Sequence, residues 1–251
     1  MALQAYVQAQ VFGYLLVLAR LGAALAFLPA LGETRIPARA RLSFALVLAL
    51  ALYPATPVPA ADPAALWVFV GRLAAEVTVG LWIGLTARVL YAALDFAGYQ
   101  IGQIAGLANA LSPGLGSFEG ATAVANLLLT GGIAAIFVTD THQLMIRALL
   151  YSYQVFPPGR LILADMAGQI VKAAGASFYI GVTIATPFLV MGTILNLGLA
   201  LANRMMPSLP VFFVAGSVLI GAALLVLAVA LPEILRGVLL RLADWFGTFT
   251  L

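Results

Sequence analysis

Long runs without a charged residue constrain this chain more than any other feature. These runs cover residues 1–19, 42–61, 96–118, 120–139, 173–203 and 205–232. A helix needs about 20 mainly apolar residues to cross the hydrocarbon core of a membrane. Hydrophobic residues make up 64% of the chain and charged residues only 8%, whereas about 25% of an average soluble protein is charged. This composition excludes an ordinary soluble enzyme and indicates a polytopic membrane protein.

Helices explain the apolar runs better than strands do. The runs are rich in Leu and Ala and lack the alternation of apolar and polar residues that marks the strands of membrane barrels. Because a backbone in hydrocarbon must satisfy its own hydrogen bonds, we expect an all-α fold. The pattern predicts helices near 3–31, 40–53, 65–92, 94–111, 120–152, 170–203 and 209–231. Several of these lengths do not suit a straight crossing, so bent, tilted or protein-buried helices are expected.

The residue types that carry common enzyme chemistry are scarce. There is no Cys and only one His, which excludes disulfides, Cys-ligated zinc, iron–sulfur clusters and thiol catalysis. No P-loop, HExxH or GxSxG motif is present. The net charge of +3 comes from 12 scattered basic residues and not from a basic run. We therefore expect no enzyme activity, no cofactor, no metal and no nucleic-acid partner.

Asp140 and His142 stand out because they lie inside the expected helix 120–152. Ionisable groups at membrane depth are costly and often functional, and histidine titrates near neutral pH, so one interpretation is a proton relay. The alternative, which we favour, is a helix end at the membrane interface with hydrated or paired charges. A relay needs further partners, and the candidate acids are isolated in the sequence: Glu76, Asp95 and Glu119.

Basic residues give little information on orientation. The turn 33–41 holds three arginines and Glu33, which favours the cytoplasmic side of a membrane, but the remaining loops do not decide the question. Arg20 and Lys172 lie near expected helix ends. Long basic side chains at such positions usually extend to the membrane interface, and we expect the same of these two.

Glycines recur at a spacing of four residues in two places. Gly80 and Gly84 share one helix face, and Gly98, Gly102 and Gly106 share another. Glycine at this spacing lets helix backbones approach closely. The pattern predicts tight helix packing, either within the chain or between subunits. The nearby glutamines could form hydrogen bonds across helices or face a pore, and both alternatives stay open: Gln100 and Gln103.

An irregular segment, 106–118, interrupts the apolar pattern without adding a charge. Its centre, Ser112-Pro113-Gly114-Leu115-Gly116, cannot continue a helix. Irregular backbone between membrane helices is tolerated only where it is buried in protein or lines an aqueous path. From composition alone, an ordinary external loop is the simpler interpretation.

Several short blocks, taken in order along the whole chain, resemble a known family. The most distinctive is Ala97-Gly98-Tyr99-Gln100-Ile101-Gly102-Gln103-Ile104-Ala105-Gly106-Leu107-Ala108-Asn109-Ala110, followed by Ser112-Pro113. Further blocks lie at 20–42, 76–84, 141–159, 184–187 and 196–207. Together they are similar to the FliR/SctT family, the export-gate proteins of flagella (FliR) and injectisomes (SctT). The chain departs from the family pattern at Pro207-Ser208-Leu209-Pro210-Val211-Phe212.

This resemblance implies a polytopic membrane protein of long, bent helical hairpins that forms a single export-gate domain, 1–251. Residues 1–165 would form a FliP-like part and residues 166–251 a FliQ-like helical hairpin. The implied partners are FliP-like and FliQ-like subunits, an FlhB-like protein, unfolded secreted substrates and membrane lipid. The implied location is the bacterial inner membrane, at the flagellar basal body. An injectisome export gate is the alternative; a small-molecule or ion transporter is less favoured because no inverted repeat is apparent.

The resemblance also implies site residues. A channel plug would lie near 106–118, where an uncharged, glycine-rich segment can fold into a narrow lumen without a charge penalty. Its residues would be Gly106, Leu107, Ala108, Asn109, Leu111, Ser112, Pro113, Gly114, Leu115 and Gly116. Helix packing would involve Glu76, Gly80, Gly84, Gly98 and Gly102.

Overall fold

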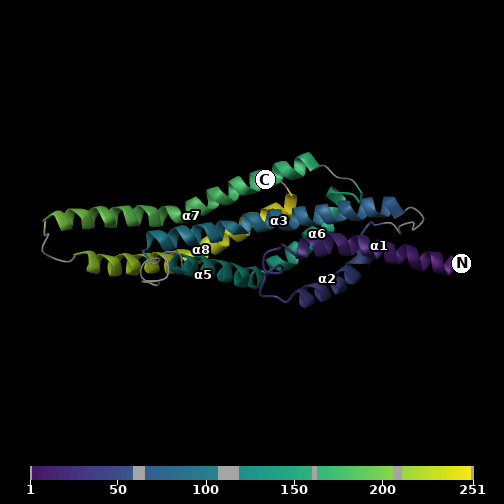
Figure 1. Cartoon of the computed structure of the whole chain (residues 1–251), viewed down its shortest axis with the longest axis horizontal. Coiled ribbons are helices and arrows are strands. Elements are labelled where there is room, and N and C mark those ends of the chain that lie inside the picture. The colour runs from purple at the N-terminus through teal and green to yellow at the C-terminus, as the bar shows by residue number, and fades with distance from the viewer. Residues whose placement is uncertain (1, 59–65, 107–118, 160–162, 206–210, 250–251) are drawn as a thin grey trace. The chain divides into compact units, whose positions relative to one another are not determined.

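The structure is a computed structural model that describes residues 2–58, 66–106, 119–159, 163–205 and 211–249. Every regular element in these ranges is a helix, so the all-α prediction is confirmed. The helices are α1 (Ala2–Leu25), α2 (Ala38–Leu52), the 3-10 helix η1 (Tyr53–Ala55), α3 (Leu66–Ile104), α5 (Glu119–Val138), α6 (Thr141–Val155), α7 (Leu163–Met205) and α8 (Val211–Thr248) (Figure 1).

The helices confirm a polytopic membrane protein. In the described part, five are long and apolar enough to cross a membrane: Tyr6–Leu25, Ala38–Ala55, Trp67–Ile104, Leu163–Met205 and Gly216–Thr248. The pair α5 and α6 would add a further, bent span. At about 1.5 Å per residue, the 43 residues of α7 extend about twice the roughly 30 Å of a bilayer core. A straight α7 perpendicular to the membrane would therefore extend well beyond the hydrocarbon core.

Two helix boundaries differ from the sequence expectation for local reasons. α1 ends at Leu25 rather than near residue 31. Pro29 disfavours helical backbone in the residue before it, and Ala30 adopts a left-handed φ of 68°. The expected break near residue 93 is absent, and α3 runs without interruption to Ile104.

The expected helix 120–152 is wrong as a single element. It breaks between α5 and α6, where the chain direction changes by 74°. Asp140 sits at this break with a φ of 56°, in the left-handed region that ends a helix. Only α6 continues from Thr141 to Val155.

The described residues group into two compact units. Unit 1 comprises Met1–Leu90, Asp140–Ala174 and Leu242–Leu251, and unit 2 comprises Tyr91–Thr139 and Gly175–Arg241. The division into a FliP-like part and a FliQ-like hairpin at residues 165 and 166 concerns a correspondence with other subunits, which this grouping does not test. It stays a prediction.

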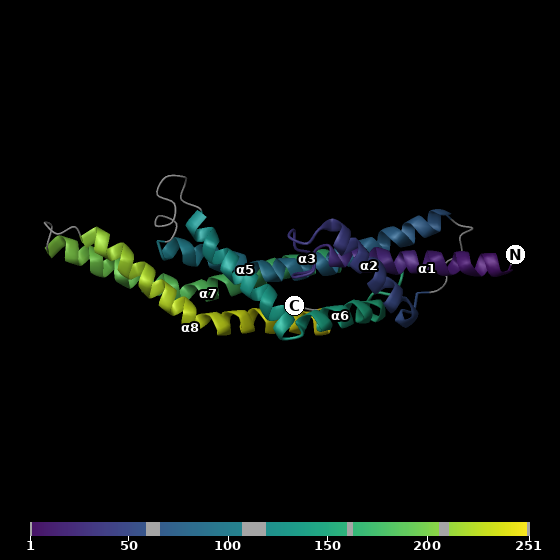
Figure 2. The same cartoon turned by 90° about the horizontal axis from the view of Figure 1, so that it is seen from below.

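In unit 1, α1 lies beside α2 and the first half of α3 (Figures 1 and 2). The contact buries Leu16, Leu21 and Ala24 of α1 completely or almost so. α2 buries only small residues, Ala45 and Ala49, because its larger side chains point away from the unit.

In unit 2, the last part of α3 packs against α5. The hydroxyl group of Tyr91 donates a hydrogen bond of 2.5 Å to the carbonyl oxygen of Leu129. The parts of α7 and α8 within this unit run in opposite directions (Figure 1). Gly181 of α7 lies against Phe96 of α3, where an added Cβ would come within 2.6 Å of the ring.

Candidate functional site

A buried ion pair joins α1 to α3 inside unit 1. The Nε atom of Arg20 lies 2.6 Å from Oε2 of Glu76, and its Nη2 atom lies 3.2 Å from Oε1. Both residues have no exposed surface. The paired planar groups form two parallel charge-assisted hydrogen bonds, which are the strong kind. The expectation that Arg20 extends to the membrane interface is therefore wrong, because Glu76 provides a partner inside the protein.

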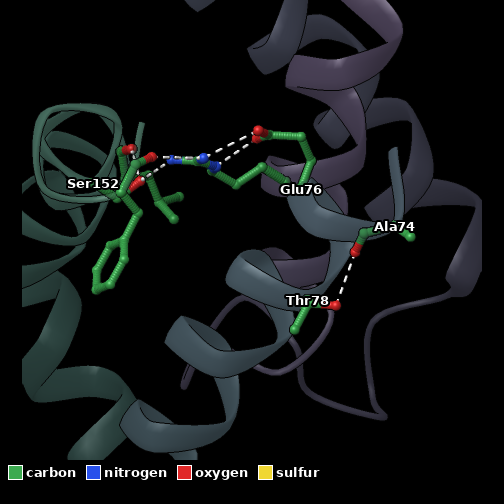
Figure 3. A network of polar contacts seen from close by, with 7 residues as sticks. Ala74, Glu76, Thr78 and Ser152 are labelled. Atoms are coloured by element: carbon green, nitrogen blue, oxygen red, sulfur yellow. Dashed lines mark hydrogen bonds and ion pairs between the residues drawn. The ribbon is translucent and has the colours of Figure 1, made fainter. Parts of the chain in front are cut away.

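The same guanidinium also holds the end of α6. Arg20 donates to Oγ of Ser152 at 3.2 Å and to the carbonyl oxygen of Phe156 at 3.0 Å. Its Cζ atom lies 3.9 Å from the ring centre of Tyr153, a cation–π contact. Figure 3 shows Glu76 and Ser152 joined through this network. One arginine therefore ties three helices together, and removing either charge would leave the other buried and uncompensated.

Gly80 and Gly84 continue the face of α3 that carries Glu76. A Cβ atom at Gly80 would overlap the carbonyl oxygen of Arg20, and one at Gly84 would lie 2.6 Å from the carbonyl oxygen of Ala24. No side chain fits at either position without moving a backbone. In unit 1, the stripe of Glu76, Gly80 and Gly84 therefore brings α1 and α3 into close contact and places one charge at its start.

The second glycine stripe packs within unit 2. A Cβ atom at Gly98 would lie 2.7 Å from the backbone nitrogen of Ala125 on α5. Gly102 is buried as well. Beside this stripe, Gln100 and Gln103 are half-buried, and Nε2 of Gln103 donates to the hydroxyl group of Tyr99 at 3.0 Å. This hydrogen bond lies within one helix. It is therefore not the hydrogen bond across helices that was one alternative for Gln103, and it does not show that the side chain faces a pore, which was the other.

Sequence reasoning missed an aromatic cluster in unit 1. Trp82 packs near Trp245, with ring centres 5.8 Å apart, and near Phe156 at 5.1 Å. Its indole donates to the carbonyl oxygen of Met166 at 2.9 Å, which anchors the start of α7. Phe249 completes the cluster. The residues lie far apart in the sequence, and no spacing pattern signals their meeting.

Asp140 and His142 occupy the helix break rather than a continuous helix. Asp140 is exposed, precedes α6 and accepts a hydrogen bond of 3.0 Å from Gln143. His142 is half-buried in the first turn of α6. No group of His, Asp and Glu residues that could hold a metal ion occurs among the described residues. The location of Asp140 at the start of α6 agrees with the helix-end interpretation, and the proton-relay hypothesis stays a hypothesis.

Comparison with known proteins decides the family. The model of the family described as Bacterial export proteins, family 1, matches residues 11–243. The chain belongs to this family. Its relatives include the flagellar biosynthetic protein FliR of Caulobacter vibrioides, with 37% identity over 88% of this chain and 90% of that protein. FliR of Escherichia coli is 27% identical over 88% and 85% of the two chains.

The family also reaches beyond flagella. The Yop proteins translocation protein T of Yersinia pestis is 31% identical over 83% of this chain and 82% of that protein. The predicted resemblance to the FliR/SctT family is therefore confirmed.

In this export protein, α7 and α8 expose large apolar side chains along much of their length. Only 17% of the most apolar stretch of each helix is buried. The exposed residues include Phe178, Tyr179, Ile194, Leu197 and Leu201 on α7, and Val218, Leu225, Val229 and Leu240 on α8. Apolar surface of this extent requires lipid or other protein around it.

The expected plug of the export protein falls mostly outside the described residues. Gly106 is described and has a φ of 69°, a left-handed conformation that suits glycine and ends the helical path of α3. Residues 107–118 lie outside the described ranges. The plug assignment of Leu107, Ala108, Asn109, Leu111, Ser112, Pro113, Gly114, Leu115 and Gly116 therefore stays a prediction.

Proposed function

We propose that this protein is the FliR-type subunit of a flagellar type III export gate in the bacterial inner membrane. It forms, with FliP-like and FliQ-like subunits, the channel through which unfolded flagellar subunits leave the cell. The similarity to flagellar FliR, 37% identity over 88% of the chain, carries this proposal. Identity to the Yersinia translocation protein is lower, at 31%. A flagellar system is therefore the first choice, and an injectisome is the second.

The apolar surfaces of α7 and α8 support an assembled state. A helix of 43 residues with 17% of its apolar stretch buried is too long for lipid alone to cover along its whole length. Neighbouring subunits with similar long helices would cover the remainder. The antiparallel course of α7 and α8 within unit 2 (Figure 1) is the arrangement expected of a FliQ-like hairpin.

The proposed role is structural and not enzymatic. The sequence lacks a nucleotide-binding motif, so the energy for export would come from a partner ATPase and the proton gradient. Segment 106–118 would act as the plug of the resting channel. The FlhB-like protein would be a further partner at the basal body.

A complementation experiment tests the proposal. A bacterial strain that lacks its own flagellar FliR protein would express this chain, and swimming and the amount of secreted flagellin would be measured. We expect both to be restored and FliP-like and FliQ-like subunits to co-purify with the chain. An injectisome strain that lacks its own translocation protein T forms the second arm. Restoration in that arm alone would assign the chain to an injectisome, and a monomer that restores neither would contradict the proposal.

A further inference from the structure

An open groove lies between α1 and α2 in unit 1, next to Val77 of α3. Its volume is about 400 Å³. Apart from Arg41, all residues that line it are apolar or glycine: Leu18, Ala19, Gly22, Ala23, Leu25, Ala26, Ala38, Leu42, Ala45 and Val77. The groove exists because both helices place small side chains along it. The space beside Gly22 is open, because a Cβ atom added there would meet no other atom within 4 Å.

The shape of the groove suits a thin, linear ligand. It follows residues 18–26, at the end of α1 and just beyond it, and residues 38–45 of α2, which corresponds to a length of about 10–12 Å at 1.5 Å per residue. A helix with its side chains is about 10 Å across, so a whole helix does not fit into this volume. A single hydrocarbon chain does.

The groove lies at a defined depth relative to the candidate spans. One span ends at Leu25 of α1 and another begins at Ala38 of α2. Where both helices cross the membrane, the turn that connects them lies at a membrane surface, and the apolar lining extends from there toward the hydrocarbon core. Arg41 lines the groove near the end where α2 begins.

The positive charge at this end lacks a compensating acid. Glu33 is already paired with Arg88, at 2.5 Å. Within the described ranges, no carboxylate forms an ion pair with Arg39 or Arg41. Arg41 donates to the carbonyl oxygen of Gly32 at 3.3 Å, a bond that leaves its charge in place.

The helix itself adds to this imbalance. α2 has no acidic residue in its first turn and no side-chain cap. The N-terminus of a helix carries a partial positive charge, so acidic residues are favoured there and arginines are not. The sequence nevertheless places Arg39 and Arg41 in the first turn. An anion bound beside them would remove this repulsion.

We propose that the groove binds an anionic phospholipid. One acyl chain lies along Gly22, Ala26 and Ala45, and the phosphate group binds Arg41. Arg39, two residues earlier in α2, does not line the groove but adds to the positive charge of this turn. A phospholipid supplies an apolar chain and an anion in one molecule, which matches an apolar groove that has one arginine in its lining. Side chains of a neighbouring subunit would fill the groove but would need a separate carboxylate for the arginines.

Photo-crosslinking tests this proposal on the full chain in phosphatidylcholine vesicles and on the assembled complex. Two probes carry the same photoactivatable acyl chain, one with a phosphatidylglycerol and one with a phosphatidylcholine head group. Cross-linked peptides are identified by mass spectrometry. We expect the phosphatidylglycerol probe to label residues 18–26 and 38–45 preferentially. The preference should fall about fivefold for each arginine replaced, given the usual attraction of one basic residue to an anionic membrane.

Matched variants separate the head group from the acyl chain. Arg39→Gln/Arg41→Gln should equalise the two probes, whereas Arg39→Lys/Arg41→Lys should keep the preference. Gly22→Leu should abolish labelling of the groove by both probes. Gly71→Leu, at another glycine with open space around it, should leave the labelling unchanged. Ala26→Leu provides a second filled groove if Gly22→Leu does not fold.

Three outcomes would overturn the proposal. The first is equal labelling by both probes in the parent, which would indicate bulk lipid. The second is labelling that persists when the groove is filled. The third is labelling of the isolated chain that disappears in the assembled complex, which would identify a neighbouring subunit as the occupant.

Discussion

The carbonyl oxygen of Arg20 lies directly against Gly80, one helical turn beyond Glu76, which binds the guanidinium of the same arginine. One residue of α1 therefore meets α3 twice, once through its backbone and once through its charge. The close approach and the ion pair depend on each other, because the guanidinium reaches Glu76 only while the backbones stay close. Separate substitutions at these positions distinguish the two contributions.

Replacing Gly80 should separate α1 from α3. In Gly80→Leu the new side chain would overlap the Arg20 carbonyl oxygen, and overpacking of this kind usually costs about 1–3 kcal/mol. We expect a lower thermal midpoint in mild detergent and less co-purification with partner subunits. Gly71→Leu is the control, because space around Gly71 is open. Equal midpoints for both variants would show that the contact contributes nothing.

Removing one member of the buried ion pair should cost more than removing both. Arg20→Met or Glu76→Gln leaves the partner buried without compensation, which typically costs about 3–5 kcal/mol. In Arg20→Met/Glu76→Leu no charge remains, and the main residual loss is the carbonyl group of Phe156, which Arg20 no longer binds. The measurement is unfolding in detergent for the two single variants and the double variant. Additive losses would mean that the two charges act independently.

A larger residue at Gly98 should disturb unit 2. In Gly98→Val the side chain would meet the backbone of Ala125 on α5, and neither backbone can move without losing other contacts. We expect a loss of stability of about 1–3 kcal/mol, measured as a shift of the thermal midpoint. Gly216→Val, at an exposed helical glycine with open surroundings, is the matched control and should show little change.

The proton-relay hypothesis for His142 can be tested without altering the helix break. Glutamine keeps hydrogen-bonding capacity but cannot carry a proton. If His142 has a structural role, His142→Gln should keep most secretion between about pH 6 and 8. Secretion by assembled complexes is compared at several pH values. A loss of secretion at every pH, with assembly intact, would favour a relay.

Shortening the segment within residues 108–117 tests the plug assignment. The segment contains Gly, Pro and Ser and no charge, so it would close a channel by filling it and excluding water. We expect complexes with the deletion to assemble and to leak small solutes, measured as membrane permeability in cells. A deletion complex that assembles and stays as tight as the parent would identify an ordinary loop.

The fold class and the existence of the two glycine stripes could be predicted from the sequence. Long uncharged apolar runs predict helices, because only helices and closed barrels satisfy the backbone hydrogen bonds of a chain in hydrocarbon. The partners of the glycines could not be predicted in the same way. Nothing in the spacing says that Gly80 meets Arg20 or that Gly98 meets Ala125, since such pairs depend on which helices become neighbours.

The buried network shows why charges are harder to predict than apolar faces. Arg20 near a helix end and Glu76 in an apolar run each look isolated along the chain, and they are 56 residues apart. Long-range pairing of this kind leaves no periodic signal. The helix break at Asp140 is a local feature, but the sequence does not predict it either. Aspartate is common both in loops and at helix starts, so its presence alone does not mark a break.

The left-handed backbone of Asp140 also limits what mutation can do at this position. A single base change in an aspartate codon can yield Asn, Gly, Ala, Val, Glu, His or Tyr. Asn and Gly adopt a positive φ readily, whereas β-branched Val does so only under strain. His is also enriched at positive φ, so Asn, Gly and His keep the backbone torsion that precedes α6, whereas the other replacements strain it.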